Sequence, residues 1–177
     1  MRLDQTPQAY QSKTTRGKYP GIQGTIQHMK QLAKEGQAHP EVRRHAVEVV
    51  RQVQPKDYLS EVAALYYDTC RRLRYTRDPA EVEYVQHPYV TLQNRAADCD
   101  DMATYQAALL GSRALSIGAP IAFVTVGFTD TRGVNQYTHV FTQVRDPRVG
   151  WVVIDPVAGP KGREMLRKVR QHKVYES

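Results

Sequence analysis

The sequence of 177 residues contains very little cysteine, since Cys70 and Cys99 are its only thiols. Two thiols cannot build the disulfide framework on which small secreted domains depend. Neither cysteine lies at zinc-ligand spacing from a histidine, so the sequence does not predict a structural zinc site. We therefore expect a protein that uses neither a metal nor a cofactor.

Long hydrophobic runs are also missing. No apolar stretch approaches the roughly 18 residues that a membrane-spanning helix needs, and residues 1–10 lack the apolar core of a signal peptide. Gly127 and Gly133 have neither the spacing nor the Lys-Ser/Thr of a phosphate-binding loop, and no base-reading motif is present. The sequence predicts a protein without membrane contact, located in the cytoplasm of the cell that produces it or carried out by another assembly.

Acidic side chains are scarce at the two ends of the chain, and the net charge of +7 is concentrated there. Lys and Arg number 10 against 5 Asp and Glu in residues 1–57, 9 against 11 in residues 58–159, and 6 against 2 in residues 160–177. The simpler interpretation is solvated helix faces followed by a basic tail. The alternative is docking to an acidic partner, either a protein or nonspecifically bound nucleic acid.

What the sequence does contain is a middle section with a clear hydrophobic pattern. Hydrophobic residues make up 41% of the chain, which is enough for one core. Apolar residues at helical spacing predict three helices in the first half, over residues 22–35, 40–53 and 59–73. We divide the chain into an extended basic arm (residues 1–21), a helical extension (22–57), a core (58–159) and a basic tail (160–177).

The stretch from Cys99 onward predicts the most buried part of the fold. Apolar residues surround nearly the whole circumference of a helix that starts at Cys99 and is ended by Gly118 and Pro120, and such a helix is buried. Cys70 lies in the apolar stripe of the preceding helix and is expected to be a small core residue. Residues 75–98 look irregular, with at most a short strand at 82–85. Three strands follow, at residues 121–128, 136–144 and 151–155, and residues 145–150 form a hairpin connection between the last two. A final basic helix is predicted at residues 163–171.

Cys99 is placed where a thiol can be activated. A thiol becomes a good nucleophile as a thiolate, and the positive end of a helix favours that form. Backbone N–H groups at the same helix start can stabilise a developing oxyanion. Asp100 and Asp101 suit a first helical turn, where acidic side chains are favoured, and we expect both to point away from the sulfur.

His139 and Asp155 complete a possible catalytic set, as a base and a group that orients the base. In an antiparallel pair, the numbers of opposed residues have a constant sum. If Arg145 faces Val149, His139 lies directly opposite Asp155, and any other even sum still leaves both side chains on one face of the sheet. We expect that face to meet the N-terminus of the Cys99 helix. It carries His139, Phe141 and Gln143 on one strand and Trp151, Val153 and Asp155 on the next.

Several segments together resemble a known family. Asp98-Cys99-Asp100-Asp101 opens an Ala/Leu helix, and three further segments follow it in order, at residues 118–124, 138–140 and 151–156. This pattern resembles the transglutaminase-like superfamily over roughly residues 58–157. Residues 77–79 look like the approach to the active-site loop in bacterial and phage-borne members.

The resemblance implies an α+β fold in which a buried, cysteine-bearing helix packs on a small antiparallel sheet. It also implies acyl transfer through a thioester, with Cys99 as nucleophile, His139 as general base and acid, and Asp155 as the orienting group. Members commonly have glycines just before the Asp-Cys pair, where this chain has Ala96-Ala97. The superfamily includes cross-linking enzymes, peptidases, amidases, deamidases and inactive members, so the fold does not determine the reaction.

Our first expectation is a cysteine hydrolase that cleaves an amide or peptide bond in a protein or peptide substrate. The small size and the basic ends are similar to proteins encoded in phage or prophage genomes, which suggests a virion component. The second hypothesis is a catalytically inactive structural or binding protein on the same fold, docking through its basic termini. The third is a nucleic-acid-associated protein that binds through charge alone.

Other polar residues near the motif are weaker candidates. Gln93 precedes Cys99 by six positions, where a side-chain amide can donate to an oxyanion as in papain-like enzymes, although it also suits a polar loop. Asp98 and Tyr89 are grouped with it as substrate or oxyanion residues, and Tyr89 can equally pack beneath a groove. His39 and His45 flank one helical stretch and are expected to be exposed.

Overall fold

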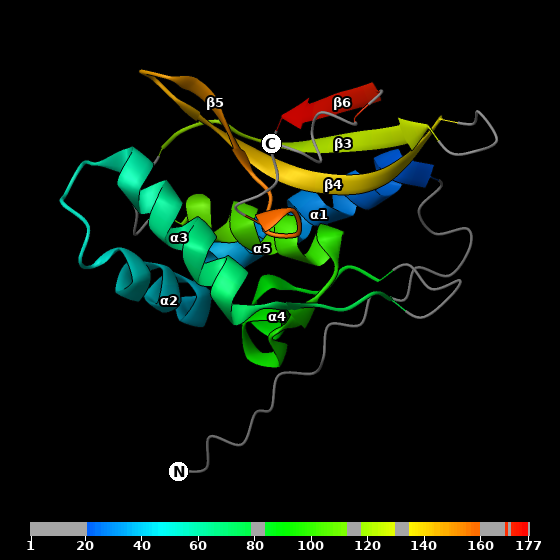
Figure 1. Cartoon of the computed structure of the whole chain (residues 1–177). Helices are drawn as coiled ribbons and strands as arrows, with labels where there is room; N and C mark the ends of the chain where they lie inside the picture. The colour runs from blue at the N-terminus through cyan, green and yellow to red at the C-terminus, as the bar shows by residue number, and fades with distance from the viewer. Residues whose placement is uncertain are drawn as a thin grey trace, which may run out of the picture.

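A four-stranded sheet lies over a layer of helices in the computed structural model (Figure 1). The structure describes residues 21–78, 84–112, 118–129, 135–159, 169 and 171–176. The helices are α1 (Gly21–Ala38), α2 (Pro40–Val50), α3 (Tyr58–Arg72), α4 (Pro88–Asn94) and α5 (Cys99–Leu110). The strands are β1 (Arg74–Tyr75), β2 (Ala96–Ala97), β3 (Ile121–Thr129), β4 (Asn135–Asp146), β5 (Gly150–Ile154) and β6 (Gln171–Glu176).

Helix α5 is the central element of the core, as its apolar circumference predicts. Every residue from 100 to 110 is buried, because α1, α4 and β4 pack around the helix. The helix ends at Leu110, eight residues before the predicted stop at Gly118. Gly111 is its C-cap, and the backbone N–H of Gly111 donates to the carbonyl of Ala107. The expectation that the helix continues to Gly118 was therefore wrong, because Gly111 already caps it.

Helix α1 is longer than predicted because Gly36 serves close packing and not helix termination. A Cβ atom at Gly36 would lie 2.5 Å from the ring of Pro88 and 2.9 Å from the side chain of Ala108. Only glycine therefore lets α1 approach both α4 and α5 at this point. The apolar side of α1 is correspondingly buried at Ile26 and Met29.

A buried ion pair joins α2 to α3. The Nε2 atom of His45 lies 2.8 Å from Oδ2 of Asp68, and both side chains are nearly inaccessible, at 10% and 12% exposure. The Nε atom of Arg72 lies 3.2 Å from the same oxygen. The expectation that His45 is exposed was wrong, because the α2–α3 interface closes over it.

Residues 75–98 contain a helix that the sequence did not predict. Pro88 looks like a breaker, but proline is favoured in the first turn of a helix, and His87 accepts the N–H of Tyr89 there as N-cap. The helix α4 ends at Arg95, whose φ of 56° is left-handed, and β2 follows directly. Of the predicted strand at 82–85, residues 82 and 83 lie outside the described residues and the other two are not in a strand.

The main sheet confirms the three predicted strands and adds a fourth. Its order is β5-β4-β3-β6, and each neighbouring pair is antiparallel. Strand β6 pairs with β3, with Phe123 opposite Tyr175. Residues 163–168 and 170 of the predicted basic helix lie outside the described residues, and Gln171 belongs to β6. Part of the predicted tail is therefore an edge strand of the core sheet.

The β4–β5 register differs from the predicted one by two residues. Arg145 lies opposite Trp151 instead of Val149, since Pro147, Arg148 and Val149 form the turn. The numbers of two opposed residues therefore add up to 296 instead of 294, as for Thr142 and Ile154. The sum is still even, so the alternation of the two strands is preserved.

The face of β4 that meets α5 is the opposite of the predicted one. Val140 and Val144 belong to the core cluster around α5, and the hydroxyl of Thr142 donates to the carbonyl of Ala103 at 2.8 Å. Phe141 packs on the other face with Val124 and Val126. The expectation that Phe141 and Gln143 face the helix was therefore wrong; His139 reaches its site near a bulge, described below.

Candidate active site

Cys99 is the first residue of α5, and the backbone around it is fixed by a capping box. The Oδ1 atom of Asp98 accepts the N–H of Asp101 at 3.4 Å, while the N–H of Asp98 donates to Oδ2 of Asp101 at 3.3 Å. These bonds satisfy N–H groups that a helix start otherwise leaves unpaired. Asp98 is therefore the N-cap that sets the position of Cys99.

The Cys99 sulfur is held against the backbone of β4. It accepts hydrogen bonds from the backbone N–H groups of Val140 and Asp100, both of which favour the thiolate. Burial, followed by the charges of Asp100 and Asp98, opposes them and raises the pKa of the Cys99 thiol to about 12. The expected lowering by the helix terminus is therefore outweighed, and the resting group is a thiol.

Three carboxyl groups crowd the same helix start. Asp98, Asp100 and Asp101 have oxygen atoms within 4.8 Å of one another, the only such acidic or histidine-cysteine group in the described part of the chain. Burial, together with a hydrogen bond to Asp98, raises the pKa of Asp100 well above its ordinary value. Asp100 also lines the same cavity as Cys99, and its charge contributes to the raised pKa of the thiol. We assign no ion to the group.

Asp101 points away from the sulfur, as expected. Its two oxygens accept the backbone and side-chain N–H groups of Gln86, each at 2.6 Å. Burial and the neighbouring Asp98 nevertheless raise the pKa of Asp101 to about 7. The segment before α4 is thus fastened to the first turn of the cysteine helix.

The structure brings His139 and Asp155 together. Nε2 of His139 lies 2.8 Å from Oδ2 of Asp155, and the two side chains are only 8% and 5% exposed. The other oxygen of Asp155 accepts the N–H of Ala158 at 3.1 Å. Because the carboxylate is an acceptor on both sides, Nε2 carries the proton of a neutral His139 ring, and Nδ1 is left with a lone pair.

Cys99 and His139 line one cavity of about 150 Å³. The register of β3 and β4 shifts at Val126 and Gly127, which leaves Thr138 as an extra residue beside His139. Such bulges redirect neighbouring side chains and are frequent next to active sites. In the described part of the chain no direct hydrogen bond joins the Cys99 sulfur to the His139 ring.

Two weaker candidates lie elsewhere. Gln93 is exposed near the end of α4. Tyr89 stacks on the ring of His39, with 4.3 Å between the ring centroids. Neither residue lines the Cys99 cavity, so the structure does not bring them to the nucleophile.

Tyr75 is a site neighbour that the sequence reasoning missed. The parallel pairing of β1 with β2 places Tyr75 opposite Ala97, two residues before Cys99. Burial and then the charge of Cys99 raise the pKa of the Tyr75 phenol, although the residue is 44% exposed. Residues 74–75 and 96–97 are too short to show strand periodicity, so only the ladder reveals this proximity. Strand β2 also accounts for Ala96-Ala97 in place of glycines, since alanine is compatible with extended backbone.

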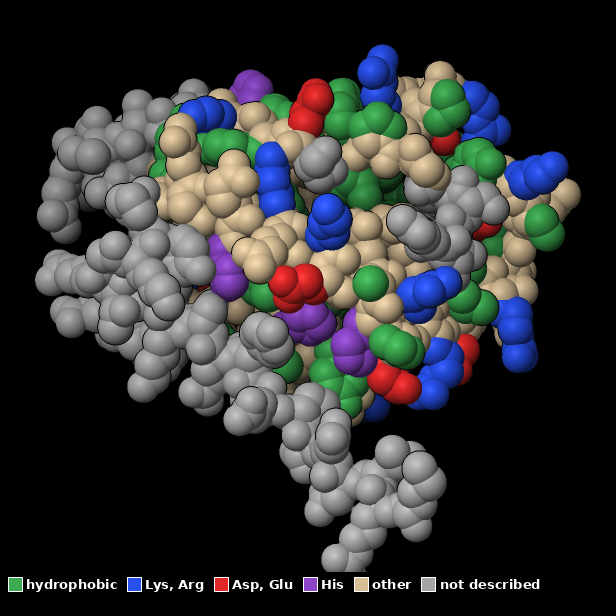
Figure 2. Space-filling view, turned by 180° about the vertical axis from the view of Figure 1, so that it is seen from behind, with side chains coloured by type: hydrophobic (Ala, Val, Ile, Leu, Met, Phe, Trp, Pro, Cys, Tyr) green, Lys and Arg blue, Asp and Glu red, His purple; other side chains and the backbone are tan. Residues whose placement is uncertain are grey.

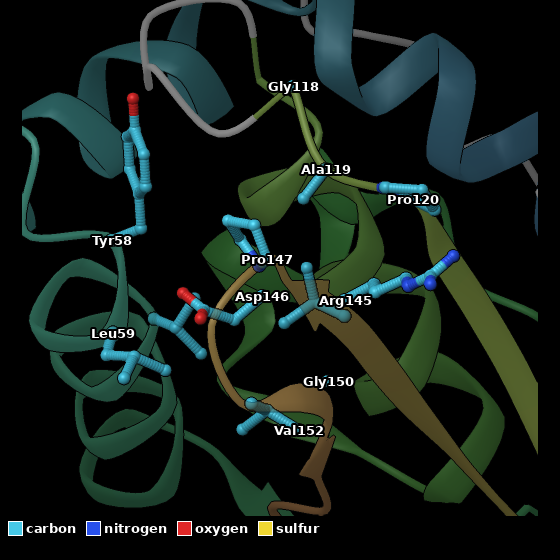
Figure 3. Close-up of a pocket in the computed structure, with 12 residues that line it drawn as sticks. Tyr58, Leu59, Gly118, Ala119, Pro120, Arg145, Asp146, Pro147, Gly150 and Val152 are labelled. Atoms are coloured by element: carbon cyan, nitrogen blue, oxygen red, sulfur yellow. The ribbon is translucent and has the colours of Figure 1, made fainter.

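A larger cavity, of about 600 Å³, lies away from Cys99 and His139. It lies between the start of α3, the segment before β3 and the β4–β5 hairpin (Figure 3). Its buried carboxylate, Asp146, accepts the N–H groups of Arg148 and Val149 within that hairpin. Neither Cys99 nor His139 lines it, so it offers no thiol chemistry.

Cys99, His139 and Asp155 all lie within the range that a family profile matches. The profile of the transglutaminase-like superfamily matches residues 44–156, more than half of the chain. The chain belongs to the transglutaminase-like superfamily. This match confirms the family and fold expected from the sequence. In this superfamily member α5 carries Cys99, β4 carries His139, and Asp155 directly follows β5.

Solved structures of two bacterial proteins share the fold of this superfamily member. One is a candidate cysteine protease from Cytophaga hutchinsonii, with a TM-score of 0.50 and 15% identity, covering 89% of this chain and 54% of that one. The other is a candidate protease from Parabacteroides distasonis, with a TM-score of 0.57 and 14% identity, covering 77% and 27%. The chain thus spans about half and about a quarter of these two proteins. A search of curated proteins finds no match.

Proposed function

We propose that this transglutaminase-like protein is a cysteine-dependent acyl-transfer enzyme, and that water is its usual acceptor. The reaction is then hydrolysis of an amide or peptide bond. The observation that carries the proposal is the 2.8 Å contact between His139 and Asp155, in a ring that borders the same cavity as Cys99. A buried His–Asp pair beside a thiol at the start of a helix is an arrangement suited to thiol acyl transfer.

The first half of the reaction forms a thioester. Nδ1 of His139 takes the proton of the Cys99 thiol as the sulfur attacks the carbonyl carbon of the amide. The developing oxyanion lies near the positive end of α5. When the C–N bond breaks, His139 returns the proton to the leaving amine, and Asp155 stabilises the imidazolium in between.

The second half releases the acid and regenerates the thiol. A water molecule attacks the thioester carbonyl, and Nδ1 of His139 accepts a proton from it. The C–S bond then breaks, the carboxylic acid leaves, and the proton returns to the Cys99 sulfur. No oxidant, metal or further co-reactant takes part in this balance.

A covalent test uses Cys70 as an internal control, since the two thiols are free and both partly buried. We expect p-nitrophenyl acetate to acetylate Cys99 and not Cys70, detected by mass spectrometry of the intact protein and its peptides. We also expect iodoacetamide at neutral pH to alkylate Cys99 faster than Cys70, with the preference lost in His139→Ala. Equal, slow modification of both cysteines in the wild-type protein overturns the proposal.

The second candidate is a catalytically inactive member that docks through its basic ends. The observation that favours it is the raised pKa of Cys99. On the face shown in Figure 2, Lys and Arg side chains are scattered among acidic ones, without one basic patch over the described residues. The expected contacts of the basic ends with an acidic protein, nucleic acid or a virion stay predictions. DNA binding that survives moderate salt would instead favour the third hypothesis, a nucleic-acid-associated protein, since nonspecific contacts weaken steeply with salt.

A further inference from the structure

We propose that helix α1 forms the specificity wall of the Cys99 site, and that this wall restricts the site to a small acyl group. The inference rests on the proposed function and adds the substrate class. Ile22, Thr25, Ile26 and Met29 line the cavity shared by Cys99 and His139. Their spacing of three, one and three residues places them on one face of the helix.

Helix α1 reaches the nucleophile because it runs alongside α5 in the same direction. Near its C-terminal end, Gly36 lies against Ala108, and Gln37 lies against Gly111. Helix α1 has 18 residues and α5 has 12, so the first turns of α1 extend beyond Cys99. There they meet the bulged part of β4 at Tyr137 and Thr138, which line the same cavity.

The cavity must hold the acyl group, because that group stays bonded to the sulfur after the amine has left. Its volume of about 150 Å³ resembles apolar cavities that hold one benzene-sized molecule, roughly 150 Å³ in size. Asp100, His139 and three threonines line the cavity beside the apolar side chains of α1. The lining is therefore mixed in polarity, and the cavity limits the acyl group by size.

The wall comes from a segment that the family match does not include. The profile begins at residue 44, whereas α1 ends at Ala38. The superfamily core therefore supplies the nucleophile and the His–Asp pair, and the preceding helix supplies the surface that limits the acyl group. This division separates the residues that do the chemistry from those that choose the substrate.

The test compares two probes of different size on the full-length chain in a Cys70→Ser background. The probes are iodoacetamide and its N-benzyl derivative, and the measured quantity is the ratio of their rate constants at Cys99. Met29→Ala removes wall atoms from a fully buried position. We expect it to raise the bulky-to-small ratio about tenfold, since relief of a steric overlap of this size is worth roughly one power of ten in rate.

Leu32→Ala is the matched control. Leu32 lies on the same helix at 3% exposure but does not line the cavity, so we expect its ratio to equal that of the parent. If Met29→Ala does not fold, Ile22→Trp is the second wall variant, because Ile22 is 37% exposed and tolerates a larger side chain more easily. Ile22→Trp should lower the bulky-to-small ratio. An unchanged bulky-to-small ratio in the folded wall variants, or an equal rise in Leu32→Ala, overturns this inference. The proposed function is tested separately, by the dependence of Cys99 reactivity on His139.

Discussion

At the scale of single residues, Cys99 is subject to opposing influences. Hydrogen bonds from two backbone N–H groups favour the thiolate, but burial and two neighbouring carboxyl groups oppose it more strongly. The thiol therefore depends on a base to lose its proton at neutral pH. His139 can serve because Asp155 occupies Nε2 and leaves Nδ1 as the acceptor.

Removal of the base should expose the raised pKa of the thiol. In His139→Ala, we expect the rate of Cys99 alkylation to rise about tenfold per pH unit from pH 7 to 10, since the thiolate fraction grows in that proportion below the pKa. No plateau should appear in this range, because the pKa of about 12 lies above it. Stopped-flow or quenched alkylation with peptide mass analysis measures the profile; a plateau near pH 8 contradicts this reading.

Asp155→Asn should impair acylation without unfolding the protein. The amide side chain favours the wrong imidazole tautomer, and in a comparable catalytic triad such a change lowered turnover about 10⁴-fold. We expect a loss of at least about 10²-fold in acetylation of Cys99 by p-nitrophenyl acetate. Asp146→Asn is the control, because Asp146 is also a buried turn residue that accepts backbone N–H groups. Equal losses in both variants would mean that a general structural effect is responsible.

At the scale of elements, the site depends on how helices are fastened to one another. The buried pair of His45 and Asp68 holds α2 on α3, and the Cys70 thiol of α3 lies 3.9 Å from the carbonyl of Pro156, next to Asp155. Cys70 is thus half-buried beside the triad aspartate. A displacement of α2 or α3 can therefore alter the position of the Asp155 carboxylate.

The α2–α3 pair should make stability fall in acid. Burial alone raises the pKa of Asp68, but hydrogen bonds from His45 and Arg72 outweigh it and hold the pKa below its ordinary 3.8. A group whose pKa is lowered by folding contributes stability that is present above its unfolded pKa and lost as pH falls through its folded pKa. In Asp68→Asn, we expect the loss of stability below pH 4 to become shallower, measured by urea unfolding.

The companion variant His45→Ala leaves the aspartate buried with one partner fewer. We expect it to lower the unfolding free energy by about 3 kcal/mol at pH 7, as for other broken buried pairs. The exposed Arg44→Ala, whose partner Glu41 is also solvent-accessible, should change it by less than about 1 kcal/mol. Similar losses in the two variants would contradict a special role for the buried pair.

At the scale of the whole molecule, the C-terminal segment is part of the sheet. Strand β6 covers the edge of β3, and β3 and β4 carry Thr125 and His139 of the Cys99 cavity. An exposed strand edge is prone to pairing with other chains. No helix in the described ranges combines the length and apolarity needed to cross a bilayer.

Truncation should therefore affect the two ends differently. Deleting residues 160–177 removes β6, so we expect a lower Tm, association of the protein in size-exclusion chromatography and slower labelling of Cys99. Deleting residues 1–20, which the sequence predicts to be an arm, should leave the labelling rate unchanged. Unaltered Tm and labelling after the C-terminal deletion would show that β6 is dispensable.

Local patterns were sufficient for much of the fold. The unbroken apolar circumference after Cys99 predicts the buried helix α5, and β-branched runs predict β3, β4 and β5, because each depends only on neighbours within a few positions. The even register sum was predicted correctly, but the turn is displaced by one residue and the other face of β4 meets α5. Helix α4 and the two-residue strands β1 and β2 escaped prediction, since they are too short for periodicity and depend on pairing across about 20 residues.

By itself, the sequence determined which side chains have the chemistry for acyl transfer and in which elements they lie. Only the tertiary structure decided that burial outweighs the helix terminus at the Cys99 thiol, that α1 lines the cavity and that β6 pairs with the edge of β3. The physical reason is that desolvation, charge separation and cavity shape arise between segments distant in sequence. Such quantities come into existence only when those segments pack together.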